Sequence, residues 1–160
     1  MTRSFLSLVL TVIVAGPALA QVNPRGSTTT ADGKVKIDYG RPSAKGRDVL
    51  SMISPGSYWR MGADQSTKLV NEVPVMVGTT TVAPGEYTLL GHFVSADEFH
   101  LVVARSVGDG EEPEDVAAKA RGEIRKGQEH VEEMTLAFEG DSLVLSWAGS
   151  RIRMPVKAGK

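Results

Sequence analysis

Basic and aromatic side chains gather in one stretch of the sequence, residues 39–62. Between residues 41 and 60 the chain carries four bases and one acid, Asp48, which gives a formal charge of +3. Arginine forks bind carboxylate, sulfate or phosphate through paired hydrogen bonds, and aromatic rings can stack on a sugar or another flat ligand. The composition indicates a binding site for an anionic small molecule or glycan. The residues expected to line it are Arg41, Lys45, Arg47, Tyr58, Trp59, Arg60 and Asp64.

The same residues also fit a structural role. The arginines could cap carbonyl groups of a long loop and pair with Asp48, Asp64 or the acids of residues 109–115. Trp59 would then anchor that loop in the hydrophobic core. On this interpretation the arginines are buried and paired, whereas a binding site would leave them exposed around a cleft.

Motifs for catalysis are weak. Gly140-Asp141-Ser142-Leu143 matches an esterase signature by letter, but it lies between two alternating segments, where Gly-Asp predicts a hairpin turn. The histidines at positions 92, 100 and 130 lack the spacing of a metal site. We therefore assign no catalytic residue, metal or cofactor. A hydrolase with Asp48 or Asp64 as base is the least favoured hypothesis, because no nucleophile is evident.

The first twenty residues predict a cleaved signal peptide. Arg3 precedes an apolar run at residues 5–16, Pro17 breaks the helix, and Ala18-Leu19-Ala20 is a small-x-small cleavage site. The run is shorter than the ~20 apolar residues that a membrane span needs. We expect residues 21–160 to form one exported domain, soluble in the periplasm or outside the cell and not inserted in a membrane.

Composition narrows the class of protein further. The chain has no cysteine, so neither a disulfide nor thiol chemistry is available, and the hydrophobic core must stabilise the fold. The formal net charge of −1 argues against nucleic acid, which favours strongly basic domains.

Alternating apolar residues predict β-strands along most of the chain. Val35, Ile37 and Tyr39 alternate after the turn Asp32-Gly33, which predicts a hairpin over residues 28–39. Further strands are expected at residues 67–73, 74–77, 79–82, 86–93 and 99–104, and one helical turn at residues 48–53.

The C-terminal part predicts a three-strand meander, with turns at Gly140-Asp141 and Gly149-Ser150. Residues 113–121 fit either a helix or a strand, and we favour a strand over 118–125. The expected fold class is all-β with little helix, a single-domain antiparallel β-sandwich, with a β-barrel as the alternative.

Two pieces of the basic–aromatic stretch resemble a known family. The sequence Arg41-Pro-Ser-Ala-Lys-Gly-Arg47 followed by Trp59-Arg-Met-Gly-Ala-Asp64 is similar to the signature of bacterial exported proteins grouped as "domain of unknown function 2911". Residues 23–27 and 83–89 resemble that family's opening and one of its strands. The resemblance covers most of residues 22–156. It implies export and a β-rich fold and brings no established activity.

Two features depart from the family pattern. Residues 53–58 replace its usual Val-Pro-Tyr-Gly-x-Val, and Asp64 stands where asparagine is common. If that asparagine's amide contacts a ligand, Asp64 changes the charge and the hydrogen-bond donors of the site. We expect a non-catalytic binding module for an anionic or glycan-like envelope ligand, with a structural or protein-interaction domain of the envelope as the alternative.

Overall fold

The computed structural model describes residues 22–159, and the predicted signal peptide lies outside them. Strands dominate this part of the chain, which confirms the all-β prediction. They are β1 (Arg25–Thr29), β2 (Val35–Gly40), β3 (Tyr58–Trp59), β4 (Thr67–Asn71), β5 (Val75–Val77), β6 (Thr80–Val82), β7 (Gly85–Ser95), β8 (Glu98–Val107), β9 (Pro113–Glu139) and β10 (Ser142–Ala158). Two short 3₁₀ helices, η1 (Leu50–Met52) and η2 (Asp109–Glu111), complete it. No helix among residues 22–159 is long and apolar enough to cross a membrane.

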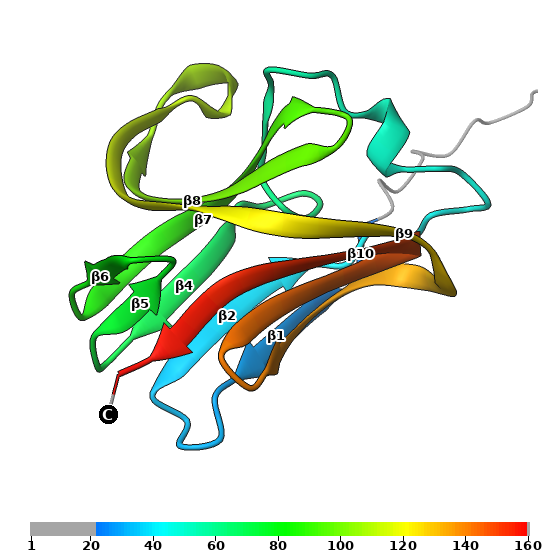
Figure 1. Ribbon diagram of the computed structural model, residues 1–160. Helices are drawn as coiled ribbons and strands as arrows, with labels where there is room; N and C mark the ends of the chain where they lie inside the picture. Colours follow the sequence, from blue (N-terminus) through cyan, green and yellow to red (C-terminus); the bar gives the residue numbers. More distant parts are fainter. Residues whose placement is uncertain (1–21, 160) are drawn as a thin grey trace, which may run out of the picture.

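One antiparallel sheet links all the strands, in the order β1-β2-β4-β7-β8-β9-β10-β5-β6, with β3 added beside β7. Strand β9 joins its two parts. Its first half, to Gly122, pairs with β8, and its second half, from Glu123, pairs with β10. In Figure 1 the orange and red strands of the β9–β10 hairpin cross in front of the blue and cyan strands β1 and β2. The sheet thus folds over on itself into the predicted sandwich-like arrangement.

The predicted three-strand meander is wrong, because strands β9 and β10 form a single hairpin. The turn at Gly140-Asp141 is as predicted, but Gly149-Ser150 lies inside the continuous strand β10 and makes no turn. Ala148 adopts a positive φ of 50°, and the pairing with β9 shifts on both sides of it. Such a bulge bends a strand without ending it. Residues 113–158 therefore form one long, bent hairpin.

The structure also answers the predictions for residues 118–125 and 48–53. Residues 118–125 form a strand as favoured, inside the much longer β9. The helical turn predicted at residues 48–53 is the 3₁₀ helix η1, with Val49 and Leu50 buried. Met52, in the same turn, is 62% exposed.

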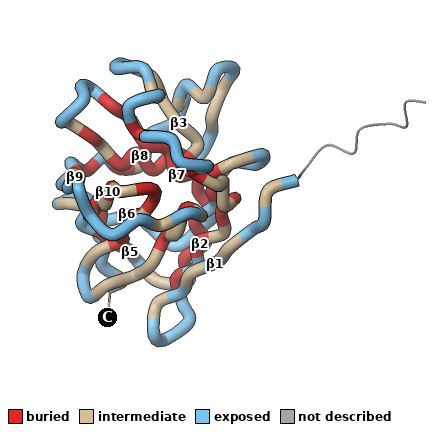
Figure 2. The backbone as a smooth tube through the Cα atoms, turned by 90° about the vertical axis from the view of Figure 1, so that its right-hand side faces the viewer, coloured by how far each residue is buried: buried red, intermediate tan, exposed pale blue. Residues whose placement is uncertain are grey.

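One hydrophobic cluster of described residues fills the space between the layers. The residues of strand β4 alternate between buried and exposed, because successive side chains of a strand point to opposite faces of the sheet. Figure 2 shows the buried stretches gathered in the middle of the molecule and the exposed stretches at its turns. Fully buried members include Ile37, Leu89, Phe99, Met134 and Leu145.

Tyr39, at the end of β2, ties the two layers together. The residue is 3% exposed, and its hydroxyl donates a hydrogen bond of 3.3 Å to the carbonyl of Leu136 in β9. Its ring also lies close to Gly26 of β1, where an added Cβ would sit 2.9 Å from a ring carbon. The ring thus packs among β1, β2 and β9.

Two substitutions of Tyr39 separate its packing from its hydrogen bond. Tyr39→Phe should cost about 1 kcal/mol of unfolding free energy, because it removes one buried hydrogen bond. Tyr39→Ala should cost roughly 3–5 kcal/mol, because it also leaves a cavity between the layers. Urea unfolding measures both values, and equal losses would contradict the packing role of the ring.

Candidate functional site

The loop that follows β2, residues 41–47, lies along the edge of β9. The Met134 N–H donates to the Pro42 carbonyl (3.0 Å), and the Ala44 N–H donates to the Glu132 carbonyl (2.8 Å). Ser43, between them, forms an antiparallel bridge with Glu133. The 41–47 loop therefore continues the sheet by a few residues, and its backbone is fixed by β9.

The Glu132 side chain fastens this loop a second time. Its carboxylate accepts hydrogen bonds from the Ser43 hydroxyl, from the Lys45 backbone N–H (2.8 Å) and from the His130 ring (3.0 Å). These bonds favour the ionised form and hold the pKa of Glu132 at about 2, with Ser43 the largest cause and then His130. Lys45 itself adopts a positive φ of 50° and is exposed.

Two of the predicted arginines hold the loop by binding backbone carbonyl groups. Arg41 donates from Nε to the Met134 carbonyl (3.3 Å) and pairs with Glu133 at 3.2 Å. Arg47 donates from Nε to the carbonyl of Ala44 (2.9 Å), in its own loop. Both therefore cap carbonyl groups, as the structural interpretation expects. They are not buried, since the Arg41 side chain is 33% exposed and Arg47 is an exposed residue.

Arg60 and Asp64 lie in a different group of contacts. Arg60 pairs with Glu111 of η2 and donates to the Asp64 carbonyl (2.9 Å). The Asp64 carboxylate accepts the Asn23 N–H at 2.9 Å. Asp64 has a positive φ of 66°, a conformation in which asparagine and aspartate are enriched, so an aspartate suits the backbone at this position.

Tyr58 and Trp59 each stack on another ring. The Tyr58 ring lies 4.4 Å from His92, and the Trp59 ring lies 5.9 Å from Trp147. One face of each ring is therefore covered by the protein, and Trp59 also packs against the core. Trp59 is thus placed to anchor the chain after η1 to the sheet. His92, which stacks on Tyr58, has its pKa lowered by burial and lowered further by Lys119.

Backbone contact joins the two pieces of the motif. A Cβ on Gly40 would lie 2.1 Å from the Ala63 carbonyl oxygen, and a Cβ on Gly62 would lie 3.0 Å from the Gly40 carbonyl oxygen. The segments on either side of the basic–aromatic stretch thus cross with no room for side chains at the crossing. This close approach accounts for both glycines.

Three of the predicted site residues, Arg47, Arg60 and Asp64, line two separate cavities. One, of about 360 Å³, lies where the 41–47 loop meets the bend of the β9–β10 hairpin. We call it the loop cavity. Its lining is Gly46, Arg47, Asp48, Lys126, Gly127, His130, Ala148, Gly149 and Ser150. Arg60 and Asp64 line another cavity, of about 740 Å³, which holds three bases and four acids. The predicted residues are therefore not gathered around one pocket.

Three residues of the loop cavity were not expected from the sequence. Lys126, His130 and Ser150 come from the middle of β9 and β10, and nothing in their local spacing marks them. Ser150 is 7% exposed and lines the cavity. In the sequence, this site is marked only by Ser150, which directly follows Gly149 at the bend.

The family model described as "Protein of unknown function (DUF2911)" matches residues 23–156. The chain belongs to this family. No curated protein and no solved structure gives a significant match. The matched range contains the 41–47 loop, the β9 edge that holds it and both sides of the loop cavity. Membership in DUF2911 brings no activity with it, so the site has to be interpreted from its own chemistry.

Ser43, Glu132 and His130 of this DUF2911 domain do not form a catalytic relay. In a serine hydrolase the histidine lies between the hydroxyl and the carboxylate. Here the carboxylate lies between the hydroxyl and the ring. Among residues 22–159 no group of three or more histidine, cysteine, aspartate or glutamate side chains is placed to hold a metal ion.

The backbone crossing makes a prediction about Gly40. Gly40→Ala should lower the unfolding free energy by about 3 kcal/mol, because the new methyl group would collide with a backbone carbonyl that cannot turn away. Gly149→Ala is the matched control, since its Cβ would meet only the Gln128 carbonyl oxygen at 3.6 Å. The control should change stability by at most ~0.5 kcal/mol. Similar losses in both variants would contradict the crossing.

Acid should release the loop through Glu132. Its folded pKa of about 2 lies below the ordinary value of 4.5, so its contacts stabilise the protein fully above pH 4.5 and are lost as the pH falls toward 2. Wild type should therefore lose more unfolding free energy across this window than Glu132→Gln, measured by urea titration at a series of pH values.

The control for Glu132 is Glu129→Gln. Glu129 is exposed on the same strand, and its carboxylate accepts no hydrogen bond from the described residues. This variant should keep the acid response of wild type. If Glu132→Gln and Glu129→Gln behave alike, the carboxylate does not fasten the loop.

Proposed function

We propose that the protein is an exported, non-catalytic binding module that holds a small anionic or glycan-like ligand of the cell envelope in the loop cavity. One observation carries the proposal. The cavity brings Arg47, from the basic–aromatic stretch, together with Lys126 and the nearly buried Ser150. These residues are distant in the sequence and come from three separate parts of the chain.

The chemistry of the lining suits an anion. The lining holds two bases, Arg47 and Lys126, and one acid, Asp48. Lys126 also pairs with Asp97, outside the lining, at the long distance of 3.5 Å. Arg47 uses Nε and one terminal nitrogen for carbonyls of its own loop, at 2.9 and 3.3 Å. A guanidinium has further N–H donors, so Arg47 can be held in place by the loop and still donate to a ligand.

The shape of the cavity suits a small polar molecule. Its volume of about 360 Å³ lies within the range of roughly 300–1,000 Å³ that is usual for small-ligand sites. Gly127, Ala148 and Gly149 form part of the wall, where short side chains leave the backbone within reach of a ligand. The Ser150 hydroxyl can both donate and accept, which is useful for a sugar hydroxyl or a carboxylate.

The export part of the proposal rests on residues 1–20. A positive residue, a short apolar run and a small-x-small site form the pattern of a signal peptide. Cleavage would release residues 21–160 into the periplasm or the medium. The ligands to consider are therefore those of the cell envelope.

The alternative function is a structural or protein-interaction domain of the envelope. It is favoured by the internal contacts of Arg41, Arg47 and Arg60, each of which binds a protein carbonyl. On this view the basic motif serves the fold alone, and the loop cavity binds none of the probes below.

Calorimetric titration of residues 21–160 tests the proposal. The probes are N-acetylmuramic acid, glucose 1-phosphate and citrate, which represent an acidic sugar, a sugar phosphate and a carboxylate. At least one should bind saturably, and its affinity should fall as salt is added, because exposed charges are screened. Lys126→Gln should raise the dissociation constant about tenfold, which is the loss of one charged hydrogen bond.

Lys126 is preferred to Arg47 for this test because Arg47 also holds the loop. Lys36→Gln is the control, since Lys36 is an exposed lysine on β2, away from the cavity lining. It should bind as wild type does. Failure of all three probes, or equal effects of the two lysine variants, would favour the structural alternative.

A further inference from the structure

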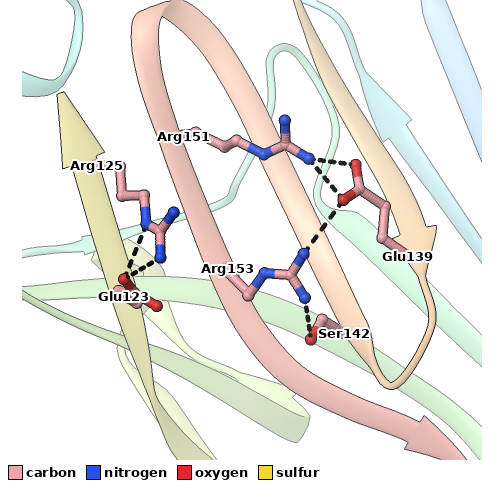
Figure 3. A network of polar contacts seen from close by, with 6 residues as sticks. All are labelled: Glu123, Arg125, Glu139, Ser142, Arg151 and Arg153. Atoms are coloured by element: carbon pink, nitrogen blue, oxygen red, sulfur yellow. Dashed lines mark hydrogen bonds and ion pairs between the residues drawn. The ribbon is translucent and has the colours of Figure 1, made fainter. Parts of the chain in front are cut away.

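Three arginines surround a small pocket on the β9–β10 hairpin. Arg125 belongs to β9, and Arg151 and Arg153 belong to β10. The pocket has a volume of about 120 Å³ and is completed by Glu123 and Gln128. Figure 3 shows Arg125 paired with Glu123 on one side, and Arg151 and Arg153 converging on Glu139 on the other.

The strand register places two of these charges against each other. Arg151 and Arg125 are direct partners across the β9–β10 ladder. Like charges directly opposite each other destabilise a sheet. Glu123, the cross-strand partner of Arg153, binds Arg125 on its own strand, with a nitrogen–oxygen distance of 2.8 Å. This exposed pair offsets part of the repulsion, and Glu123 is then not paired with Arg153.

Glu139, the other acid of this group, already binds two arginines. Glu139 accepts from Arg151 with both oxygens, at 2.5 Å each, and from Arg153 at 3.4 Å. Arg153 also donates to the Ser142 hydroxyl (3.1 Å). Three bases therefore meet two acids, so the group carries a net charge of +1, with Arg151 and Arg153 sharing Glu139. The arginine side chains are 40–64% exposed, so their free N–H groups can reach a ligand.

We propose that this pocket binds one singly charged oxyanion group, such as a carboxylate, a sulfate ester or a phosphate diester. One negative charge balances the group and screens Arg125 from Arg151. Guanidinium forks match the oxygen geometry of all three groups. The volume equals that of about four liquid water molecules, at ~30 Å³ each, so it fits the charged group rather than a whole sugar or nucleotide.

This arginine pocket goes beyond the loop cavity, because the two have no lining residue in common. They are nevertheless neighbours in the chain. Ser150 pairs with Lys126, and the next pair along the ladder is Arg151 with Arg125. Successive residues of a strand point to opposite faces. The hairpin thus offers one site on each face, and variants of one leave the other's residues intact.

Dimethyl phosphate, methyl sulfate and acetate are suitable probes, titrated at low ionic strength with the Arg Nε–H signals followed by NMR. We expect saturable shifts of the Arg125 and Arg151 signals. Arg125→Gln should raise the dissociation constant of the bound probe about tenfold or more. It leaves the contacts of Glu139 in place, so the hairpin keeps its internal ties. Arg151→Gln should weaken binding by a similar factor.

Arg105→Gln is the matched control. Arg105 is 53% exposed and pairs with one acid, Asp115, at 3.2 Å. This variant should bind the probes as wild type does. Saturation of none of the probes, or affinity in Arg125→Gln equal to that of Arg105→Gln, would overturn the proposal. Lys126→Gln, which impairs the loop cavity, should leave these affinities unchanged.

Vesicles distinguish two sources of the oxyanion. Phosphatidylglycerol vesicles should sediment wild type more than Arg125→Gln if the group is a lipid phosphate diester, with phosphatidylcholine vesicles as the uncharged comparison. Binding to the soluble probes without such sedimentation assigns the pocket to a soluble anion. Sedimentation that does not depend on Arg125 would contradict the lipid source.

Discussion

The structure depends on the backbone hydrogen bonds between the 41–47 loop and β9. The Ala44–Glu132 and Met134–Pro42 bonds turn a stretch without strand periodicity into an extension of the sheet. Once that edge is fixed, Glu132 can hold Ser43 and the Lys45 backbone, and Arg47 is placed beside the hairpin bend. The loop cavity exists because these two elements are held together. A loop attached only by its side chains would leave Arg47 without a defined position.

The arginines of the basic–aromatic stretch therefore combine two roles that the sequence alone leaves as alternatives. Arg41, Arg47 and Arg60 each bind a carbonyl, yet none is fully buried. Ion pairs at such exposure contribute little to stability, about 0–1 kcal/mol. Their internal contacts are better understood as fixing the direction of each guanidinium. A preoriented guanidinium loses less conformational entropy when it binds a ligand, so structural contact and binding are compatible at Arg47.

Sequence periodicity predicted most strands because half-buried strands alternate, as Val35, Ile37 and Tyr39 do. It failed at Gly149-Ser150, since a glycine within a strand marks a bulge as readily as a turn. The site was harder to predict. Residue type identified Arg47, but Lys126, His130 and Ser150 join it only through the register of β9 with β10. Local spacing carries no information on that register once the strand bends.

The bend itself links the two faces of the hairpin. Arg151 and Lys157 of β10 reach back to Glu139 and Asp141 at the hairpin tip, so polar contacts tie the tip to the base. Gly127 and Ala148, both with positive φ, lie where the strands change direction. Straightening the hairpin would separate Arg47 from Ser150 and also Arg151 from Glu139. The repulsion between Arg125 and Arg151 acts at the same point of the ladder. The loop cavity and the arginine pocket thus share the bend of the β9–β10 hairpin but no lining residue, so each site can be altered by substitutions that leave the other's residues intact.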